Sequence, residues 1–306
     1  MYKRQLGNSD LYVSELSLGC MSLGKDAEKA KSIIDLAINA GINYLDTADL
    51  YDFGENERTV GEAIKGRRND IIIGTKAGNN FTPGQEGWTW DPSKSHIKSA
   101  VKDSLQRLGI DYIDLYQLHG GTIDDPVDET IEAFDELKKE GIIREYGISS
   151  IRPNVIKEYV KKSDIVSVMM QFNVLDRRPE EAILELLDDN NISVLARGPL
   201  AKGMLSTKAQ EKVKEKGQDG FLDYSYEELK ALIDKWKDYE SSERTLEALA
   251  LQYILHNKTV AAAVFGASSI EQLENNLSYL EAAPLTEQMF GEIQAMTKPL
   301  TYKNHR

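Results

Sequence analysis

The sequence predicts a (β/α)8 barrel, the TIM-barrel fold of the α/β class. Eight short apolar segments alternate with longer amphipathic segments, and several of the longer ones stop at a glycine, the residue that most readily ends a helix. The chain has 306 residues, which suits one barrel of about 250 residues with some additions. A doubly wound parallel sheet is the structural alternative, because it is built from the same alternation.

The apolar segments are short and rich in Ile, Val and Leu, as is typical of parallel strands that are buried on both faces. The predicted strands cover residues 16–19, 41–46, 70–74, 111–117, 143–148, 165–170, 192–196 and 260–264. Each is followed by a segment with helical periodicity, which makes eight strand and helix units in order.

The segment 26–40 shows the helical pattern, because its apolar residues, among them Ile33 and Ala37, fall on one stripe and the pattern stops at Gly41. Besides 26–40, the predicted helices cover 57–65, 93–108, 126–140, 153–161, 179–189, 242–256, 269–280 and 286–296. The helix 153–161 opens with Pro153, a residue suited to the first turn.

Two segments are additional to the eight strand and helix units of a minimal barrel. Residues 2–13 alternate around a Gly-Asn-Ser-Asp turn, which predicts a β-hairpin that caps the floor of the barrel. Residues 205–240 are long, charged and rich in Lys and Glu, so we expect a long loop over the C-terminal face and treat it as a candidate lid. The whole chain, 1–306, is expected to form a single barrel domain.

The composition excludes several classes of protein. A formal net charge of −13 opposes binding to nucleic acid or to an anionic membrane, because both partners are themselves negative. The single cysteine, Cys20, cannot form an internal disulfide and fits a reducing compartment, where it would be a small buried hydrophobe. The first residues lack the apolar core of a secretory signal and no apolar run reaches the length of a membrane span, so a cytoplasmic location is expected.

Polar side chains follow three neighbouring predicted strands. Asp46 ends the second strand, Lys76 and His119 follow the third and fourth, and Tyr51 lies in the loop after the second. The C-terminal ends of barrel strands meet at one mouth, where polar residues are usually catalytic. Taken singly, each has an ordinary alternative role, as a helix cap, a surface ring, a solvated charge or a satisfied histidine. Their joint placement predicts a site that handles protons.

With these residues in place, the chain resembles the aldo-keto reductase family, in particular its bacterial members related to the β-subunits of potassium channels. The matching motifs are Leu45-Asp-Thr-Ala-Asp-Leu-Tyr51, Gly54, Asn56-Glu57, Gly74-Thr-Lys76, Leu118-His119, Gly141-Ile-Ile-Arg144 and Tyr146-Gly-Ile-Ser149. They occur in order over essentially the whole chain, and their combination is far more specific than any one of them.

The resemblance implies a mechanism of carbonyl reduction by NAD(P)H. Tyr51 would be the general acid that protonates the developing alkoxide, although a free tyrosine, with a pKa near 10, is too weak an acid to act unaided at neutral pH. The Lys76 ammonium would favour the phenolate, and Asp46 would hold Lys76 in place. His119 would orient the substrate carbonyl, and the substrate would be a small molecule.

The resemblance also places the nicotinamide end of the cofactor. The residues that it assigns there are Gly19, Cys20, Met21, Asp46, Ser149, Ser150, Gln171, Arg197, Gly198, Pro199 and Leu200. Arg197 stands where the family usually has a tyrosine that stacks on the nicotinamide. A guanidinium is flat and can stack as well, but it also brings charge.

The phosphate end is assigned near the last strand and after the seventh. The residues are Lys202, Gly203, Gly266, Ala267, Ser268, Gln272, Asn275 and Asn276. Backbone amides near a helix start suit a phosphate. Gln272 stands where many relatives have an arginine, so NADPH (NADP) is expected from family habit and NADH stays an alternative. Lys202 is either a source of positive charge for the phosphates or a solvated loop lysine.

The sequence gives no support to a P-loop, a metal site or a Rossmann domain. Residues 19–25 have the spacing of a P-loop, but Asp26 replaces the hydroxyl residue that would bind magnesium. The four histidines, His96, His119, His256 and His305, and the lone cysteine show no spacing typical of metal ligands, so no metal is expected. A Gly-x-Gly-x-x-Gly fingerprint is absent from the sequence, which leaves a Rossmann domain unsupported.

Two other functions stay open at this point. Lys76 in a barrel could form a Schiff base, as in aldolases, and a protein that binds NADPH with little turnover would be a redox sensor. The substrate is set by loops 77–92, 120–125 and 205–240, whose conformation the sequence does not give. Trp88 and Trp90 in the first of these form either an apolar wall for the substrate or ordinary loop packing.

Overall fold

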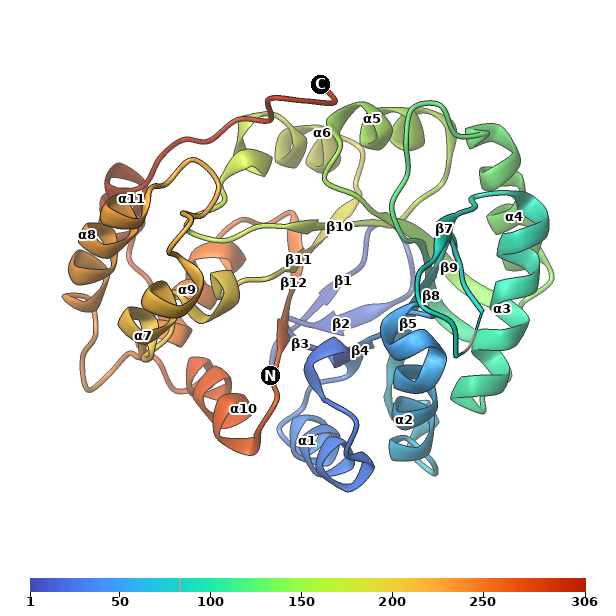
Figure 1. The fold of residues 1–306 in the computed structure, drawn as a ribbon, viewed down its shortest axis with the longest axis horizontal. Coiled ribbons are helices and arrows are strands. Elements are labelled where there is room, and N and C mark those ends of the chain that lie inside the picture. Colours follow the sequence, from blue (N-terminus) through green and yellow to red (C-terminus); the bar gives the residue numbers. More distant parts are fainter. Residues whose placement is uncertain (83) are drawn as a thin grey trace.

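A computed structural model describes residues 1–82 and 84–306 of the chain. Eight parallel strands close into a barrel, with helices around the outside (Figure 1). In barrel order from the first strand along the chain, these are β3 (Leu16–Gly19), β4 (Tyr44–Asp46), β5 (Ile72–Ala77), β8 (Ile113–Leu118), β9 (Ile143–Ser149), β10 (Ser167–Gln171), β11 (Ser193–Arg197) and β12 (Val260–Gly266). The barrel prediction is confirmed, and the doubly wound alternative is wrong because β12 pairs with β3 and closes the sheet.

The outer helices follow the predicted order. They are α1 (Ala27–Asn39), α2 (Glu55–Ala63), α3 (Lys94–Leu108), α4 (Val127–Lys139), α5 (Pro153–Lys162), α6 (Ile183–Asp189), α9 (Leu246–Leu255), α10 (Ile270–Leu277) and α11 (Glu287–Met296). Local chemistry fixes their ends. The side chains of Asp26 and Ser93 accept hydrogen bonds from the first turns of α1 and α3, and Gly109 ends α3 with a φ of 64°.

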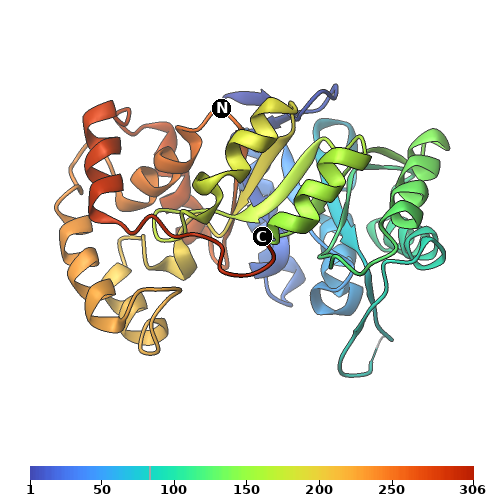
Figure 2. The ribbon, with the colours of Figure 1, turned by 90° about the horizontal axis from the view of Figure 1, so that it is seen from above.

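The hairpin of β1 (Lys3–Gln5) and β2 (Tyr12–Ser14) is antiparallel and closes the floor of the barrel, as predicted. Leu6, Leu11 and Val13 from the hairpin join a buried cluster with Tyr44 and Leu115, which point inward from barrel strands. Figure 2 shows the hairpin on the opposite side of the barrel from the loop that follows β5. The other mouth is therefore the one left for a site.

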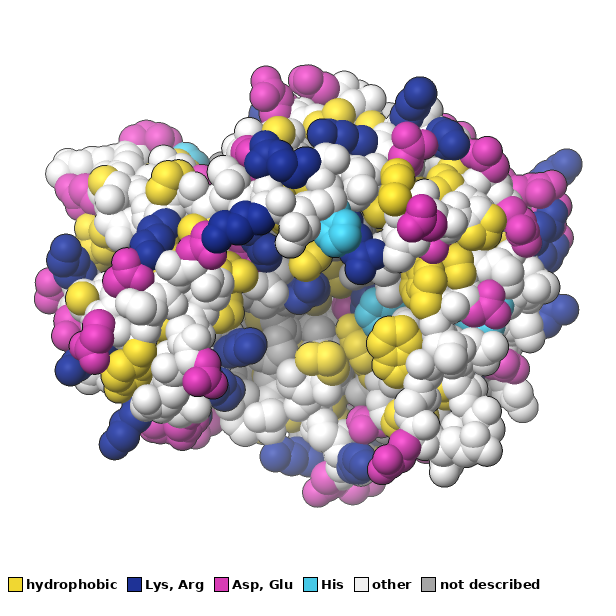
Figure 3. Space-filling model, turned by 45° about the horizontal axis from the view of Figure 1, so that its top comes forward, with side chains coloured by type: hydrophobic (Ala, Val, Ile, Leu, Met, Phe, Trp, Pro, Cys, Tyr) yellow, Lys and Arg dark blue, Asp and Glu magenta, His cyan; other side chains and the backbone are white. Residues whose placement is uncertain are grey.

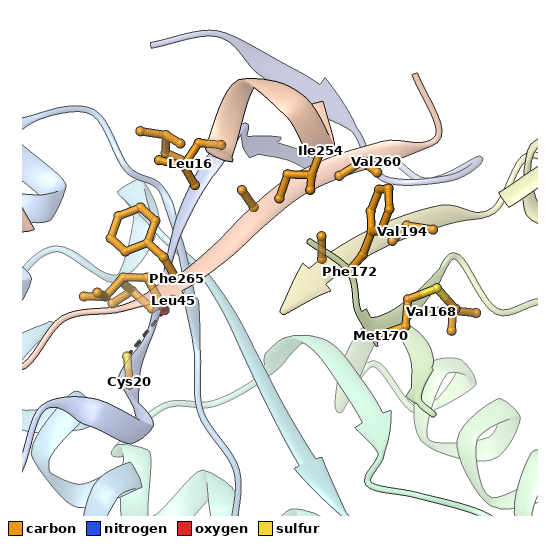
Figure 4. Packing of buried hydrophobic residues seen from close by; sticks show 14 of the residues in the cluster. Leu16, Cys20, Leu45, Val168, Met170, Phe172, Val194, Ile254, Val260 and Phe265 are labelled. Atoms are coloured by element: carbon orange, nitrogen blue, oxygen red, sulfur yellow. Dashed lines mark hydrogen bonds between the residues drawn. The ribbon is translucent and has the colours of Figure 1, made fainter. Parts of the chain in front are cut away.

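The main hydrophobic core lies between the strands and the surrounding helices. Figure 4 shows part of it, where Leu16, Leu45 and Phe265 from the neighbouring strands β3, β4 and β12 gather together. Cys20 is fully buried beside them, in agreement with its expected role as a small hydrophobe. None of the helices in the described part of the chain is both long and apolar enough to span a membrane.

Residues 205–240 form the long insertion expected between β11 and α9, and within it the chain folds into two helices that the sequence analysis did not predict, α7 (Ala209–Lys216) and α8 (Tyr226–Lys237). Ser225 and Glu228 form a capping box at the start of α8. Within the charged sequence, Leu229, Ile233 and Trp236 are spaced for one helical face, and that face is buried. Burial of this stripe stabilises α8.

Candidate active site

Four predicted polar residues meet where barrel strands end. Asp46 is the last residue of β4, Lys76 lies near the end of β5, and His119 directly follows β8. Tyr51 opens η2 (Tyr51–Gly54), the turn between β4 and α2. Asp46 and Tyr51 each lie within hydrogen-bonding distance of Lys76, and the rings of Tyr51 and His119 pack against each other.

The ammonium of Lys76 is the centre of this cluster and is completely buried. Its Nζ donates to Oδ2 of Asp46 at 2.6 Å and to the carbonyl oxygen of Thr47 at 2.7 Å, and it lies 3.4 Å from the phenolic oxygen of Tyr51. Burial alone would lower the pKa of Lys76, but the Asp46 carboxylate overcomes this effect and raises the pKa. Lys76 is therefore a fixed cation at neutral pH.

Asp46 is held from its other side by two donors. Oδ1 accepts from the hydroxyl of Tyr44 at 3.1 Å and from Nε2 of Gln117 at 3.4 Å. Burial raises the pKa of Asp46, and the Lys76 ammonium together with these donors acts against that rise. Both carboxylate oxygens thus have partners, so the carboxylate can fix the position of Lys76.

Tyr51 is partly exposed and faces an open cleft. Its ring packs edge-on against His119, with 5.7 Å between ring centres, and Nζ of Lys76 lies 5.0 Å from the centre of the Tyr51 ring. The chain then turns sharply, because Asp52 and Phe53 have φ values of 48° and 52°. Left-handed backbone at non-glycine residues is costly and is found mainly where function requires it.

His119 is a neutral imidazole. Burial, together with the positive charges of Lys76 and Arg197, lowers the pKa of His119 to about 3. Its Nδ1 is buried and has no hydrogen-bond partner in the described part of the chain. A neutral imidazole can donate one hydrogen bond without bringing a second charge beside Lys76.

Glu57 and Arg107 form an ion pair that the sequence did not predict, and Glu57 also contacts Thr75 of β5. Oε2 of Glu57 accepts from Nε of Arg107 at 2.6 Å, and Oε1 accepts from the hydroxyl of Thr75, the residue before Lys76, at 2.5 Å. A Cβ on Gly54 would lie 2.7 Å from Cδ of Arg107, so the motif needs glycine there for space as well as for its φ of 93°. Glu57 and Gly54 carried the family resemblance, but the motif gave no sign of Arg107 as their partner.

A cleft with a volume of about 770 Å³ extends from Tyr51 along the C-terminal face. The predicted cofactor residues that line it are Gly19, Met21, Asp46, Gln171, Arg197, Gly198, Pro199, Leu200, Lys202, Gly203, Gly266, Ser268, Gln272, Asn275 and Asn276. Cys20, Ser149, Ser150 and Ala267 are not among its lining residues. Cys20 and Ala267, which directly follow β3 and β12, are fully buried and belong to the main hydrophobic core.

The catalytic end of the cleft contains the half-buried guanidinium of Arg197. Nη1 of Arg197 donates to Oε1 of Gln171 at 3.3 Å, and Gln171 in turn donates to Asp176 at 2.8 Å. No carboxylate lies within 4.0 Å of the Arg197 guanidinium among the described residues. Burial lowers the pKa of Arg197.

The other end of the cleft lies between α10 and the segment that follows β11. Oε1 of Gln272 accepts from the backbone amide of Ser268 at 2.8 Å and from its hydroxyl at 3.1 Å, so a side chain of the protein occupies an amide predicted to bind phosphate. Opposite α10, four lysines line the cleft, namely Lys202, Lys208, Lys212 and Lys216. The last three were missed, although their spacing of four residues is that of one helical face.

The aromatic residues of the loop after β5 do not line this cleft. Nε1 of Trp90 donates to Asp125 at 2.9 Å, and a Cβ on Gly78 or Gly120 would lie 2.8 Å or 3.1 Å from the Trp90 ring. Trp90 thus ties the loops 77–92 and 120–125 together, which is the packing role, while Pro83 in the first loop lies outside the described residues. Trp88 is 53% exposed, and its role as a substrate wall stays a prediction.

The face that carries the cleft is hollowed at its centre (Figure 3). Lys and Arg side chains gather on one side of the hollow and hydrophobic side chains on the other. The cleft therefore offers a charged side and an apolar side to a bound molecule. In the part of the chain that the structure describes, no cluster of three or more His, Cys, Asp or Glu residues is arranged to hold a metal ion.

The sequence is similar to a family model and to known proteins. The model of the aldo/keto reductase family matches residues 15–298. The chain is 59% identical to the uncharacterized oxidoreductase YqkF of Bacillus subtilis over the full length of both proteins, and 30% identical to the NADH-specific methylglyoxal reductase of Escherichia coli over 92% of this chain and 94% of that one.

The structure also matches solved structures. The holo form of the aldo-keto reductase AKR11C1 from Bacillus halodurans superposes with a TM-score of 0.94 at 58% identity, over 100% of this chain and 99% of that one. The glycerol dehydrogenase AKR11B4 from Gluconobacter oxydans matches with a TM-score of 0.84 at 24% identity, which shows the shared barrel, over 99% and 98% of the two chains. Because the family model covers nearly the whole chain and the relatives match from end to end, this protein belongs to the aldo/keto reductase family.

Proposed function

We propose that this chain reduces aldehydes or ketones to alcohols with a nicotinamide cofactor, with Tyr51 as the general acid. The observation that carries the proposal is the position of Tyr51, which faces the cleft while the buried Lys76 ammonium lies 3.4 Å behind its phenolic oxygen. Reduction in this family is generally dependent on NAD(P)H. When bound, the nicotinamide supplies the hydride.

The cleft fits such a cofactor. Its volume of about 770 Å³ lies within the range of roughly 300–1,000 Å³ found for small-molecule sites. Its lining combines amide side chains, such as Gln171 and Asn276, with the lysines opposite α10, which suits a molecule with an amide at one end and phosphates at the other. Gly266 allows β12 to pass close to η1 (Cys20–Ser22), because a Cβ there would lie 2.5 Å from the hydroxyl of Ser22.

The proton step follows from the fixed charges. Tyr51 gives its proton to the oxygen that becomes the alcohol, and the Lys76 ammonium stabilises the phenolate that remains. Asp46 holds Lys76 at 2.6 Å, so the ammonium does not need to move during the reaction. Neutral His119, packed against the Tyr51 ring, is placed to donate a hydrogen bond to the same substrate oxygen.

The geometry argues against the two alternative functions. A Schiff base needs a neutral and accessible amine, whereas Lys76 is completely buried, hydrogen-bonded and kept charged by Asp46. A sensor with little turnover has no use for a proton donor supported by an ammonium at the cleft. Sustained oxidation of the cofactor that depends on a carbonyl compound would exclude the sensor.

The test is the variant Tyr51→Phe, which removes only the hydroxyl. Turnover should fall by at least about 100-fold, the lower range for loss of a general acid, while the affinity for NADPH and NADH, measured by quenching of tryptophan fluorescence, should change by less than about twofold. The matched control is Tyr12→Phe on the hairpin at the far end of the barrel. Parallel loss of turnover and of cofactor binding in Tyr51→Phe would refute the acid role.

The substrate class is approached with the same assay. Aromatic aldehydes, dicarbonyls similar to methylglyoxal and sugar aldehydes are to be compared, each with NADPH and with NADH. The hydrophobic side of the hollow face favours aromatic or aliphatic aldehydes over sugars (Figure 3). A preference for sugar aldehydes would contradict this expectation, but it would not contradict the role of Tyr51 as the general acid.

A further inference from the structure

Arg197 is the cation at the catalytic end of the cleft. It is the last residue of β11, and its backbone pairs in register with Gln171 at the end of β10. Burial is the main reason for the low pKa of His119, and the positive charges of Lys76 and Arg197 add to it. Tyr51 acts against the burial that lowers the pKa of Arg197. The guanidinium therefore lies close enough to Tyr51 and His119 for its charge to act on both.

No carboxylate neutralises this guanidinium. Among the described residues, no Asp or Glu oxygen lies within 4.0 Å of it, and its partner is the neutral Oε1 of Gln171 at 3.3 Å. Gln171 donates to Asp176 at 2.8 Å, but both oxygens of Asp176 also accept from Arg178, each at 2.7 Å. The acid that could have served Arg197 is thus already paired with another arginine.

Part of the guanidinium is open to the cleft. Only Nη1 of Arg197 has a hydrogen-bond partner in the described part of the chain. The other two nitrogens are not among the buried side-chain atoms that lack a partner, so they retain contact with solvent. Because Arg197 lines the cleft, a bound molecule meets a flat cation there.

The charges of the catalytic end do not cancel. The acidic residues that line the cleft are Asp46 and Glu247. Asp46 is paired with Lys76, and Glu247 accepts from the backbone amide of Thr207, in the lysine-rich segment after β11. The histidine of the site is neutral. The charge of Arg197 is therefore left over where the proton is transferred.

The two redox states of a nicotinamide cofactor differ in charge at one place. The oxidised ring is positive, the reduced ring is neutral, and the phosphates are the same in both. A ring that exchanges hydride with a carbonyl group beside Tyr51 has to lie at the catalytic end, which is the end that contains Arg197. An unpaired guanidinium at that end repels the oxidised ring and has no such effect on the reduced one.

This effect comes from a departure of the chain from the family pattern. A tyrosine, the usual residue at this position, is uncharged and can stack on either redox state. Arg197 can also stack, but it adds an interaction that depends on the charge of the ring. A half-buried cation without a counter-charge costs stability, so its presence at this position calls for a function.

We propose that Arg197 makes the cleft discriminate between the redox states of its nicotinamide cofactor, so that the reduced form binds more tightly than the oxidised form. This inference rests on the proposed function, because it assumes that the cleft holds such a cofactor. It applies to NADPH and NADH alike, since the charge in question is on the ring. At equal concentrations of the two forms, the reduced one occupies the cleft, and the oxidised one is a weak product inhibitor.

The experiment measures the dissociation constants of NADPH, NADP⁺, NADH and NAD⁺ by calorimetry, without substrate, for the wild type, Arg197→Gln and Arg197→Lys. The wild type should bind each reduced form at least about tenfold more tightly than its oxidised form, because two unit charges a few ångströms apart at a protein surface repel by at least this equivalent. Arg197→Gln removes the charge and should lower the ratio about tenfold, mainly through tighter binding of the oxidised form. Arg197→Lys keeps the charge and should keep most of the ratio.

Arg152→Gln is the matched control. Arg152 is also half-buried, but it donates to the carbonyl oxygen of Gly121 at 2.6 Å and does not line the cleft. This variant should keep the ratio of the wild type. Added salt should lower the ratio in the wild type and leave it unchanged in Arg197→Gln, because salt screens the repulsion between the two cations.

Three results would overturn the proposal: a wild type that binds both redox states equally or prefers the oxidised one; a ratio in Arg197→Gln equal to that of the wild type; or a loss in Arg197→Lys as large as in Arg197→Gln, which would assign the effect to shape. The binding readout keeps the two proposals apart. A ratio that depends on Arg197 in a wild type that reduces no carbonyl compound would support this inference and refute the proposed function. Carbonyl reduction with an unchanged ratio would do the reverse, and a wild type that binds none of the four cofactors would refute both. Thermal unfolding of each variant, followed by circular dichroism, verifies that it is folded.

Discussion

The ion pair between Asp46 and Lys76 provides a prediction that separates stability from catalysis. Lys76 is completely buried and Asp46 is 3% exposed, with 2.6 Å between Nζ and Oδ2. The substitution Asp46→Asn keeps the shape of the side chain but leaves the ammonium without its counter-charge. Removal of one partner from a buried pair costs about 3–5 kcal/mol, whereas replacement of both partners by neutral groups is often close to neutral.

The magnitude follows from what remains around each group. In Asp46→Asn, Lys76 keeps the carbonyl of Thr47 as a strong acceptor, so we expect the low end of the range, about 3 kcal/mol lost from the free energy of unfolding. That loss corresponds to a fall of roughly 6–12 °C in the melting temperature for a chain of this size. In the double variant Asp46→Asn/Lys76→Met, the free energy of unfolding should return to within about 1.5 kcal/mol of the wild type.

The free energy of unfolding should depend on pH differently in the wild type and in Asp46→Asn. In the wild type, Asp46 raises the pKa of Lys76 above its unfolded value, so the stability contributed by this group is complete below about pH 10.5 and is lost only as the pH rises through the folded pKa. In Asp46→Asn, the largest of the influences that oppose burial is removed, so the folded pKa of Lys76 should fall. This variant should therefore gain stability as the pH rises from about 8 to 10.5, where the contribution of Lys76 in the wild type stays constant.

The assay is urea unfolding followed by circular dichroism at several pH values, with the midpoints compared at an unchanged m-value. All three variants, including Lys76→Met alone, should lack carbonyl reduction, whatever their stability. The reasoning would be refuted if Asp46→Asn lost less than about 1 kcal/mol, or if the double variant were no more stable than Asp46→Asn.

Two further predictions concern neighbours of this pair. Because the pKa of His119 is lowered to about 3, this residue should not titrate between pH 5 and 8, and the profile of kcat/KM against pH should show no limb due to it. His119→Asn should lower the rate without changing the shape of the profile. A limb that is present in the wild type and absent from His119→Asn would contradict this prediction. A Cβ at position 74 would lie 2.2 Å from the hydroxyl of Tyr44, which donates to Asp46. Gly74→Ala should therefore lose about 1–3 kcal/mol of unfolding free energy, the usual cost of overpacking, and Tyr44→Phe in the same chain should restore part of it, as measured by urea unfolding; no rescue would show that the clash is relieved elsewhere.

The sequence was sufficient to predict the barrel and to bring Asp46, Tyr51, Lys76 and His119 to one mouth. Both predictions depend on local signals, because each strand is a short apolar run and each of these residues stands at or just after a strand end. The ion pair behind β5 was harder to predict. Arg107 meets Glu57 from a helix 50 residues away in the chain, and no local pattern marks such a pair.

The segment 205–240 shows the opposite difficulty. It was predicted only as a long charged insertion, although Leu229, Ile233 and Trp236 have the spacing of one helical face. Ser225 and Glu228 also have the spacing of a capping box. The sequence therefore contains local signals for α8 in addition to its charged composition.

The two ends of the cleft are built from different kinds of element, and this difference determines how much a substitution at each end should cost in stability. Asp46 and Lys76 belong to barrel strands, and their contacts leave little room for change without loss of the buried pair. Lys202 and Lys216 lie on η5 (Ala201–Gly203) and α7, outside the barrel strands, and both are exposed. Substitution of either lysine should therefore cost less free energy of unfolding than loss of one partner of the buried pair.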